Sequence, residues 1–166
     1  IRTPGSGLAG YLTTFTAAGS VAASFMVIDI LWVNTGVVVT TTTAQTLTSV
    51  AFPARDIDGA TAGNGVQLGI LVTTATTNAA AITNTTALYT NSAGTGSRTA
   101  TISGFPATAL AGTLVPFQLA AGDEGVGAVA SVTLGTSYGG GLFNLNGQVD
   151  TLNCTFSGNT AQSSGA

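Results

Sequence analysis

The segment VQLGILVTT at residues 66–74 decides the fold class of this chain. Apolar side chains occupy every second position from Val66 to Val72, which is the period of a β-strand that buries one face. A glycine-rich stretch precedes the segment and a threonine-rich stretch follows it. We therefore predict a buried β-strand over residues 66–74.

The same strand-and-turn pattern extends outward in both directions. β-Branched residues come in short runs bounded by Gly, Asn and Pro, whereas stretches of helix-forming residues at helical spacing are absent. About eight to ten short strands are expected, which is typical of an all-β, single-domain antiparallel sandwich or jelly roll. The expected segments are an apolar strand at 20–33 with a turn at 34–36, one bent strand or two short ones at 37–52, a hairpin of 85–90 with 97–102, a hairpin of 114–119 with 126–134, and a hairpin of 142–145 with 148–152 across Asn146 and Gly147.

The length of 166 residues suits one domain of ordinary size. Residues 1–10, which contain Pro4 and several glycines, are expected to form an N-terminal arm. Residues 11–156 are expected to form the β-sandwich domain, and residues 157–166 a flexible C-terminal tail. The chain begins at Ile1 rather than at a methionine, so we expect that an N-terminal piece has been left out or removed.

The composition excludes several classes of function. Charged residues make up 5 % of the chain, against about 25 % in an ordinary soluble domain. Three arginines cannot neutralise a run of phosphates, so nucleic-acid binding is not expected. The chain has no histidine and no lysine, so a conventional acid–base or triad enzyme is not expected either. The surface must be neutral, and we infer that copies of the chain or a partner cover much of it; a neutral secreted monomer is the alternative.

Membrane and metal binding are also not expected. The longest apolar run, residues 21–33, is about 13 residues long and contains Asp29, whereas a membrane-spanning helix needs about 20 apolar residues. Cys154 is the only cysteine and there is no histidine, which argues against a zinc or copper site. The sequence therefore assigns no catalytic residue, no cofactor and no metal ligand.

The densest charge cluster is Asp56-Ile57-Asp58-Gly59 beside Arg55. Paired carboxylates can hold Ca²⁺ or act as a glycosidase pair, and Asn64 and Thr61 offer further oxygens. The EF-hand pattern also requires a glutamate at its twelfth position, which this loop lacks. We favour the simpler interpretation, in which Asp and Gly form an Asx-type turn and Arg55 pairs with a neighbouring carboxylate.

The other acidic residues have structural explanations. Asp29 interrupts an apolar strand, so it either lies on the wet face of that strand or is buried and pairs with Arg55 or Arg98. Asp123 and Glu124 lie at the tip of a predicted hairpin, where we expect solvated carboxylates.

The remaining candidates are also weak. Trp32, the only tryptophan, is expected to pack in the core or in a subunit contact rather than to serve as a sugar platform. Asn84-Thr85-Thr86 and Asn153-Cys154-Thr155 match the N-glycosylation pattern, which matters only in a eukaryotic secretory host. Cys154 is expected to be a small buried hydrophobe, and Gly139-Gly140-Gly141 lacks the helix and lysine of a phosphate-binding loop.

Several short motifs carry a resemblance to a known group. They are Gly10-Tyr11-Leu12, Leu31-Trp32-Val33-Asn34-Thr35-Gly36, Ala51-Phe52-Pro53-Ala54-Arg55-Asp56, Ala75-Thr76-Thr77-Asn78, Asn84-Thr85-Thr86, Gly96-Ser97-Arg98-Thr99-Ala100-Thr101-Ile102, Phe105-Pro106-Ala107-Thr108, Val115-Pro116-Phe117-Gln118-Leu119 and Leu134-Gly135-Thr136-Ser137. The chain resembles, over about residues 10–140, a group of small proteins found among the structural genes of tailed bacteriophages. Residues beyond about 142 depart from that pattern, and the resemblance carries over no catalytic residue.

The resemblance and the neutral surface together imply a function. We expect a non-enzymatic structural protein of the virion, a decoration or cement protein on the outer surface of the phage capsid that stabilises the head by bridging major capsid subunits. The expected partners are the major capsid protein and further copies of the chain, with a homotrimer favoured because it matches local three-fold positions of an icosahedral lattice. The alternative is a head-fibre, tail-fibre or adhesin β-module that binds host surface glycans through Asn, Thr, Tyr and Trp32.

Overall fold

The computed structural model describes Ser20 and residues 28–139 and 143–150. Apart from Ser20, these residues belong to one compact unit, Ile28–Asn153. The predicted N-terminal arm, the C-terminal tail, Cys154 and the sequon at Asn153 lie outside the described residues. The same holds for residues 21–27 of the first predicted strand and for two of the three glycines at 139–141.

The described part of the chain contains strands and no helix. All pairings between its strands are antiparallel, which confirms the predicted all-β class. The strands are β1 (Ile28–Asn34), β2 (Gln45–Thr46), β3 (Val66–Val72), β4 (Thr85–Asn91), β5 (Arg98–Ile102), β6 (Leu114–Pro116), β7 (Val126–Thr133) and β8 (Phe143–Asp150).

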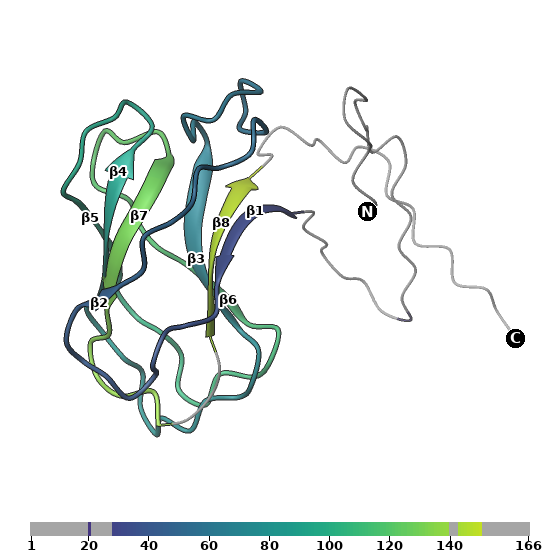
Figure 1. Cartoon of the computed structure of the whole chain (residues 1–166). Coiled ribbons are helices and arrows are strands. Elements are labelled where there is room, and N and C mark those ends of the chain that lie inside the picture. Colours follow the sequence, from purple (N-terminus) through teal and green to yellow (C-terminus); the bar gives the residue numbers. More distant parts are fainter. Residues whose placement is uncertain (1–19, 21–27, 140–142, 151–166) are drawn as a thin grey trace, which may run out of the picture. The chain divides into compact units, whose positions relative to one another are not determined.

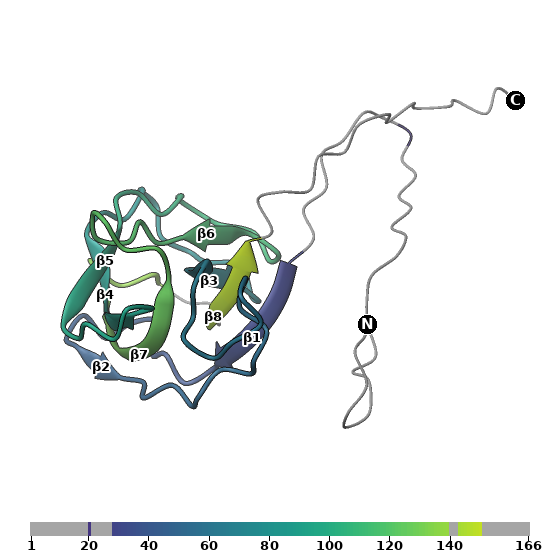
Figure 2. The same ribbon diagram turned by 90° about the horizontal axis from the view of Figure 1, so that it is seen from above.

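The strand pairing is nested along the chain. β1 pairs with β8, β2 with β7, β3 with β6, and β4 with β5. Two further pairings, β3 with β8 and β4 with β7, join these pairs into two four-stranded sheets. Sheet A has the order β1-β8-β3-β6 and sheet B the order β2-β7-β4-β5. The two groups of strands are separate in both views (Figures 1 and 2).

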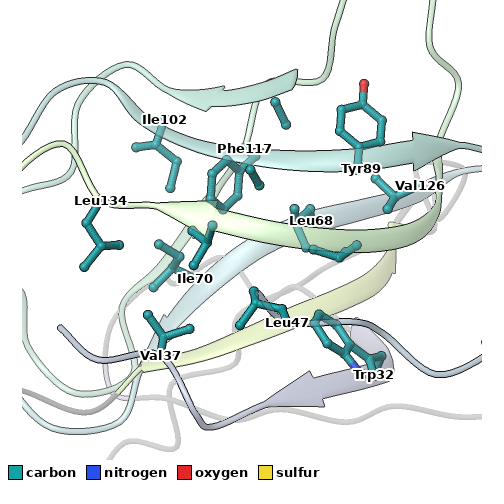
Figure 3. Close-up of a cluster of buried hydrophobic side chains, with 14 of the residues drawn as sticks. Trp32, Val37, Leu47, Leu68, Ile70, Tyr89, Ile102, Phe117, Val126 and Leu134 are labelled. Atoms are coloured by element: carbon teal, nitrogen blue, oxygen red, sulfur yellow. The ribbon is translucent and has the colours of Figure 1, made fainter. Parts of the chain in front are cut away.

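Side chains from both sheets meet in one buried cluster (Figure 3). Leu68 and Ile70 reach it from β3, and Tyr89 and Val126 reach it from β4 and β7. The strand β3 alternates as its sequence predicts, with Val66, Leu68, Ile70 and Val72 all buried. Because apolar burial is the main driving force of folding, this shared cluster holds the two sheets in one unit.

The first strand enters the core through a β-bulge. The register of β1 against β8 shifts between Ile30 and Trp32, so Leu31 is the extra residue. Leu31 and Trp32 are therefore both buried, while Ile30 and Val33 remain 43 % exposed. The predicted turn after this strand is present, and Asn34 Oδ1 accepts the Gly36 N–H at 2.8 Å.

The predicted hairpin across Asn146 and Gly147 is wrong. Both residues lie inside the continuous strand β8, which is paired with β1 on one side and β3 on the other. Gly147 pairs with Trp32 and with Leu68, whose large side chains face the core. Pairing with two neighbouring strands therefore overrides the local turn preference.

The predicted hairpin of 114–119 with 126–134 is also wrong. Both segments contain strands, but β6 pairs with β3 in sheet A and β7 pairs with β2 and β4 in sheet B. The connection from Phe117 to Gly125 therefore crosses between the sheets. The hairpin of β4 with β5 is confirmed, with Thr85 opposite Ile102 and Tyr89 opposite Arg98.

The threonine-rich stretch at 37–52 contains less strand than expected. Only β2, two residues long, is regular. The residues after β2 stay beside β7 through isolated backbone hydrogen bonds. The Leu47 N–H donates to Ala130 O, and the Ser49 N–H donates to Val129 O. Alternating β-branched residues favour a strand only where a partner strand is in reach.

Candidate functional site

The Asp56 carboxylate is enclosed by its own loop. Its Oδ1 accepts backbone N–H bonds from Asp58 at 3.1 Å and Ala60 at 2.6 Å. Its Oδ2 accepts backbone N–H bonds from Gly63 at 3.0 Å and Asn64 at 3.2 Å. The residue is 6 % exposed. Each oxygen thus faces two N–H dipoles, an environment arranged for an anion and not for a cation.

The charge state of Asp56 follows from these contacts. Burial raises the pKa of this carboxyl, but the four backbone N–H donors outweigh it, and the pKa is lowered overall. Asp58 lies outside this arrangement, with one side-chain bond from Asn64 Nδ2 at 2.8 Å. The predicted Asx-type turn is therefore present, and both oxygens of Asp56 are used by the loop itself.

The Asp56 loop packs closely against the loop that carries Asp123. Gly63 has φ +86°, and a Cβ there would lie 1.9 Å from the Val126 carbonyl oxygen, so only glycine fits. The Gly65 N–H donates to the Glu124 carbonyl at 3.0 Å. Asn64 also forms an isolated β-bridge with Gly125. The structure thus brings together two acidic loops that the sequence places far apart.

The Asp123 carboxylate lies in a buried polar cluster and is not solvated as predicted. Its side chain is 3 % exposed. Oδ2 accepts bonds from Arg98 Nε at 2.8 Å and from the Tyr89 hydroxyl, and Oδ1 accepts one from Asn91 Nδ2 at 2.7 Å. The Tyr89 hydroxyl in turn accepts the Ala120 N–H at 3.0 Å. The prediction of a solvated carboxylate is wrong for Asp123, because the strands β4 and β5 present these donors directly beneath the loop, whereas Glu124 is exposed as predicted.

This cluster shifts the titration of its members. The Arg98 guanidinium, followed by the Tyr89 hydroxyl, lowers the pKa of Asp123 to about 2. Burial, followed by the bond to Asp123, raises the pKa of Tyr89. A hydrogen-bonded ion pair of this kind keeps both charges fixed at neutral pH and leaves no group poised to exchange a proton there.

Asp29 pairs with Arg55 and not with Arg98. The Arg55 Nη1 atom lies 3.1 Å from Asp29 Oδ1, and the two side chains are 50 % and 43 % exposed. Asp29 is therefore half exposed, between the two arrangements that the sequence left open. Exposed ion pairs contribute little to stability.

Every aromatic side chain among residues 28–139 is buried. Trp32 is 8 % exposed and packs in the core, as expected, with its ring in the shared cluster (Figure 3). Tyr138 is fully buried, and its ring meets that of Phe105 edge to face at a centroid distance of 4.6 Å. Residues 28–139 thus offer no exposed aromatic platform for a sugar.

Several motifs that carry the resemblance hold one another in place. Thr76 and Ala109 exchange two bonds, and Asn78 Nδ2 donates to the Pro106 carbonyl at 3.2 Å. The hydroxyls of Thr85 and Tyr138 share a bond at 2.6 Å. Within the described residues these motifs therefore form hydrogen-bonded contacts between distant segments of the chain. The sequon residue Thr85 is buried in one of these contacts.

The outer face of sheet A is partly apolar. Strand register places Ile30 and Val33 of β1 on the face opposite to Trp32. The same face carries Gln67, Gly69 and Leu71 of β3 and Leu114 and Pro116 of β6. The central strand β8 contributes Asn144, Asn146, Gln148 and the charged residue Asp150 at the matching register positions.

The outer face of sheet B is uncharged and carries mostly hydroxyl groups. Thr86 lies between Thr101 and Thr133, and Leu88 lies between Thr99 and Ser131. Leu88, at 39 % exposure, is the only large aliphatic side chain on this face. The two outer faces thus differ in composition: aliphatic side chains, and Asp150 at one register position, on sheet A, and mostly hydroxyl groups on sheet B.

The sequence alone did not reveal the cluster of Tyr89, Asn91, Arg98 and Asp123. The available signal was the scarcity of charge, because each arginine of so neutral a chain needs a partner. No three His, Cys, Asp or Glu side chains among the described residues gather as metal ligands. In the same part of the chain, no helix is long and apolar enough to cross a membrane.

Comparisons of this chain with protein-family models, with curated proteins and with solved structures found no match in any of the three.

Proposed function

We propose that this chain is a non-enzymatic structural protein of a bacteriophage virion, a decoration or cement protein on the outer surface of the head. In this role it bridges major capsid subunits and assembles with further copies of itself, with a trimer favoured. The mechanism is the burial of additional interface across the joints of the shell, which opposes the internal pressure of packed DNA.

The observation that carries the proposal is the nested strand pairing. A long hairpin whose strands pair 1 with 8, 2 with 7, 3 with 6 and 4 with 5, rolled into two sheets, is a jelly roll, and the pairings of β1 to β8 follow this scheme. We propose that the two sheets form such a jelly-roll sandwich. Capsid and lectin domains are two common uses of this architecture.

Two further features support a structural role. The charged groups Asp56, Arg98 and Asp123 are engaged in bonds that hold loops in place. The outer face of sheet B carries no charged residue and that of sheet A carries one, Asp150, which suits a surface covered by fixed neighbours more than the surface of a free monomer.

The glycan-binding module remains the second candidate, because lectin domains share the jelly-roll architecture. Sugar platforms usually employ an exposed aromatic ring, and all described aromatic side chains from Trp32 to Tyr138 are buried. This observation favours the capsid role. Binding to a glycan array, lost on substitution of exposed Asn or Thr residues, would reverse the preference.

The test is the composition and structure of virions produced with and without the gene for this chain. We expect the protein on the head, at joints between major capsid subunits, and we expect heads without it to release DNA at lower temperature. Absence of the chain from purified virions, or its location on the tail, would overturn the proposal.

A further inference from the structure

We propose that Asp58 is a site of spontaneous covalent modification, at which the folded chain converts the Asp58-Gly59 peptide bond into an isoaspartyl linkage. The inference goes beyond the proposed function and does not depend on it, because the reaction needs only this chain and water. It rests on a structural contrast among three chemically similar dipeptides of the chain.

The reaction joins a backbone nitrogen to the side chain that precedes it. The nitrogen after an aspartate attacks the side-chain Cγ, so a C–N bond forms, the Cγ–O bond breaks and one water leaves with the proton of the nitrogen. A second water then opens the five-membered ring at the original peptide bond, which leaves the main chain running through Cβ and Cγ and restores one carboxylate. Asparagine reacts in the same way but releases ammonia, and a following glycine favours both reactions because it has no Cβ.

Glycine follows an aspartate or an asparagine at three positions, Asp58-Gly59, Asn64-Gly65 and Asn146-Gly147. The sequence alone favours the two asparagines, because ammonia is lost from an amide more readily than water is lost from a carboxylate. The structure, however, restrains both asparagine dipeptides and leaves the aspartate dipeptide open.

The Asn146-Gly147 dipeptide is restrained by the sheet. It lies within β8, which is paired with β1 on one side and with β3 on the other. Gly147 is opposite Trp32 in β1 and Leu68 in β3. The backbone rotation that brings the Gly147 nitrogen to the preceding side chain would disrupt pairing on both sides, which requires opening of the central strand.

The Asn64-Gly65 dipeptide is restrained at each of its reacting groups. The Gly65 N–H, which must lose its proton, donates to the Glu124 carbonyl in the adjoining loop at 3.0 Å. The Asn64 side chain, which must turn toward that nitrogen, donates from Nδ2 to Asp58 Oδ2 at 2.8 Å. The Asn64 N–H also donates to Asp56 Oδ2 at 3.2 Å. Reaction here requires separation of the two acidic loops.

The Asp58-Gly59 dipeptide lies in an exposed turn. Both residues are exposed, and a Cβ at Gly59 would meet no heavy atom within 4 Å. The Gly59 N–H donates inside its own turn, to the Asp56 carbonyl at 2.9 Å. The Asp58 carboxylate accepts one side-chain bond, from Asn64. The reacting atoms can therefore meet through local opening of one turn, which costs less free energy than opening a strand or a contact between loops.

The modification would also alter the environment of Asp56. An isoaspartyl linkage adds one carbon atom to the main chain between residues 58 and 59. That point lies between two N–H groups, those of Asp58 and Ala60, which both donate to Asp56 Oδ1 at 3.1 and 2.6 Å. Because their spacing changes, we expect the modified chain to unfold at a lower urea concentration than the fresh chain.

Asp58→Asn gives a matched test, because it places three Asn-Gly dipeptides in one chain and any difference in their rates then reflects the structure. The measurement is deamidation at each position by mass spectrometry of peptides, in the folded chain and in urea. We expect the folded variant to react at residue 58 at least about tenfold faster than at Asn64 or Asn146. We expect the unfolded variant to react at all three positions within about threefold of one another.

The wild-type chain gives the second measurement. Isoaspartate at residue 58, detected because endoproteinase Asp-N does not cleave before it, should accumulate in the folded chain within about fivefold of the unfolded rate. Asp58→Glu keeps the carboxylate but cannot close a five-membered ring, so it should abolish the product. Faster deamidation at Asn64 or Asn146 than at residue 58 in folded Asp58→Asn would overturn the inference. So would a folded wild-type chain that forms no isoaspartate while the unfolded chain does.

Discussion

Two buried carboxylates in adjoining loops are satisfied in opposite ways. Asp56 accepts four bonds, all from backbone N–H groups no more than eight positions along the chain. Asp123 accepts its bonds from three side chains, those of Tyr89, Asn91 and Arg98, which lie 25 to 34 positions away. The first carboxylate therefore shapes its own loop, whereas the second ties its loop to sheet B.

The difference shows what backbone donors and side-chain donors each contribute. Backbone donors are held in place by the chain itself, so the Asp56 loop can form its bonds locally, as Asx-type turns do. Side-chain donors must be brought in by the fold, so the Asp123 cluster exists only once β4 and β5 are paired. A buried polar network stabilises a structure only when all of its members are satisfied, and each cluster meets that condition differently.

Asp56→Asn should have the largest effect. An amide at this position turns an NH₂ group toward two backbone N–H donors, which lose their acceptor inside a buried loop. Each unsatisfied buried donor costs about 1–3 kcal/mol, so we expect a loss of about 2–4 kcal/mol in the free energy of unfolding, measured in urea. Asp58→Asn is the matched control, because Asp58 is exposed and has one side-chain bond. Equal losses for the two variants would show that the four N–H bonds do not stabilise the loop.

Asp123→Asn should have the next largest effect. It removes the charge that pairs with Arg98 and sets an NH₂ group among the donors of Tyr89, Asn91 and Arg98. We expect Tm to fall by about 5 °C, less than for Asp56→Asn, because Arg98 is one-third exposed and water can replace its partner. Glu124→Gln, at the neighbouring exposed position, should leave Tm unchanged. A smaller decrease in Tm for Asp123→Asn than for Tyr89→Phe would show that this carboxylate is not the main stabilising member of the cluster.

The same cluster predicts a pH dependence. The pKa of Asp123 is lowered to about 2 in the folded chain from an ordinary value of 3.8. Its contribution to stability is therefore fully present above about pH 4 and is lost as the pH falls toward 2. Asp56, whose pKa is also lowered, acts in the same direction. Urea unfolding at several pH values should show a shallower loss between pH 4 and 2 for Asp123→Asn than for the wild type, and parallel curves would refute the assignment.

The two carboxylates also mark how far the sequence can predict this site. The Asp56 turn is predictable because its donors lie within the same short loop and glycines follow the aspartates. The Asp123 cluster is not, because Arg98 and Tyr89 are aligned by the register of β4 against β5 and meet the loop only in the folded unit. Local sequence patterns thus predicted the Asp56 turn correctly and wrongly predicted a solvated Asp123.

The same distinction governs the strands. The alternation of β3 and the hairpin of β4 with β5 are local patterns, and both are confirmed. Asn146 and Gly147 are a strong local turn signal, yet pairing with β1 and β3 on both sides holds them in one strand. The partner of β6 likewise depends on the crossing between sheets, which no neighbouring residue encodes.

Tyr89→Phe separates the hydroxyl from the rest of the cluster. The substitution keeps the buried ring but removes one donor to Asp123 and the acceptor of the Ala120 N–H. We expect a loss of about 1 kcal/mol in the free energy of unfolding, since one net hydrogen bond contributes about that much. Tyr138→Phe, which removes a hydroxyl bonded to Thr85 and not to a carboxylate, provides the comparison for a neutral partner. An unchanged stability for Tyr89→Phe would mean that water replaces the hydroxyl.

Arg55→Gln should have the smallest effect, because it breaks an ion pair with Asp29 that is about half exposed at both ends. Exposed pairs contribute about 0–1 kcal/mol and are screened by salt, so we expect a change below about 0.5 kcal/mol. A double-mutant cycle with Asp29→Asn, at low and high salt, measures the coupling directly. A coupling as large as that between Arg98 and Asp123 would show that the Arg55 pair is covered in the working state. In that case the neighbouring β1 surface, and not the two acidic loops, would hold the most strongly coupled charges of the molecule.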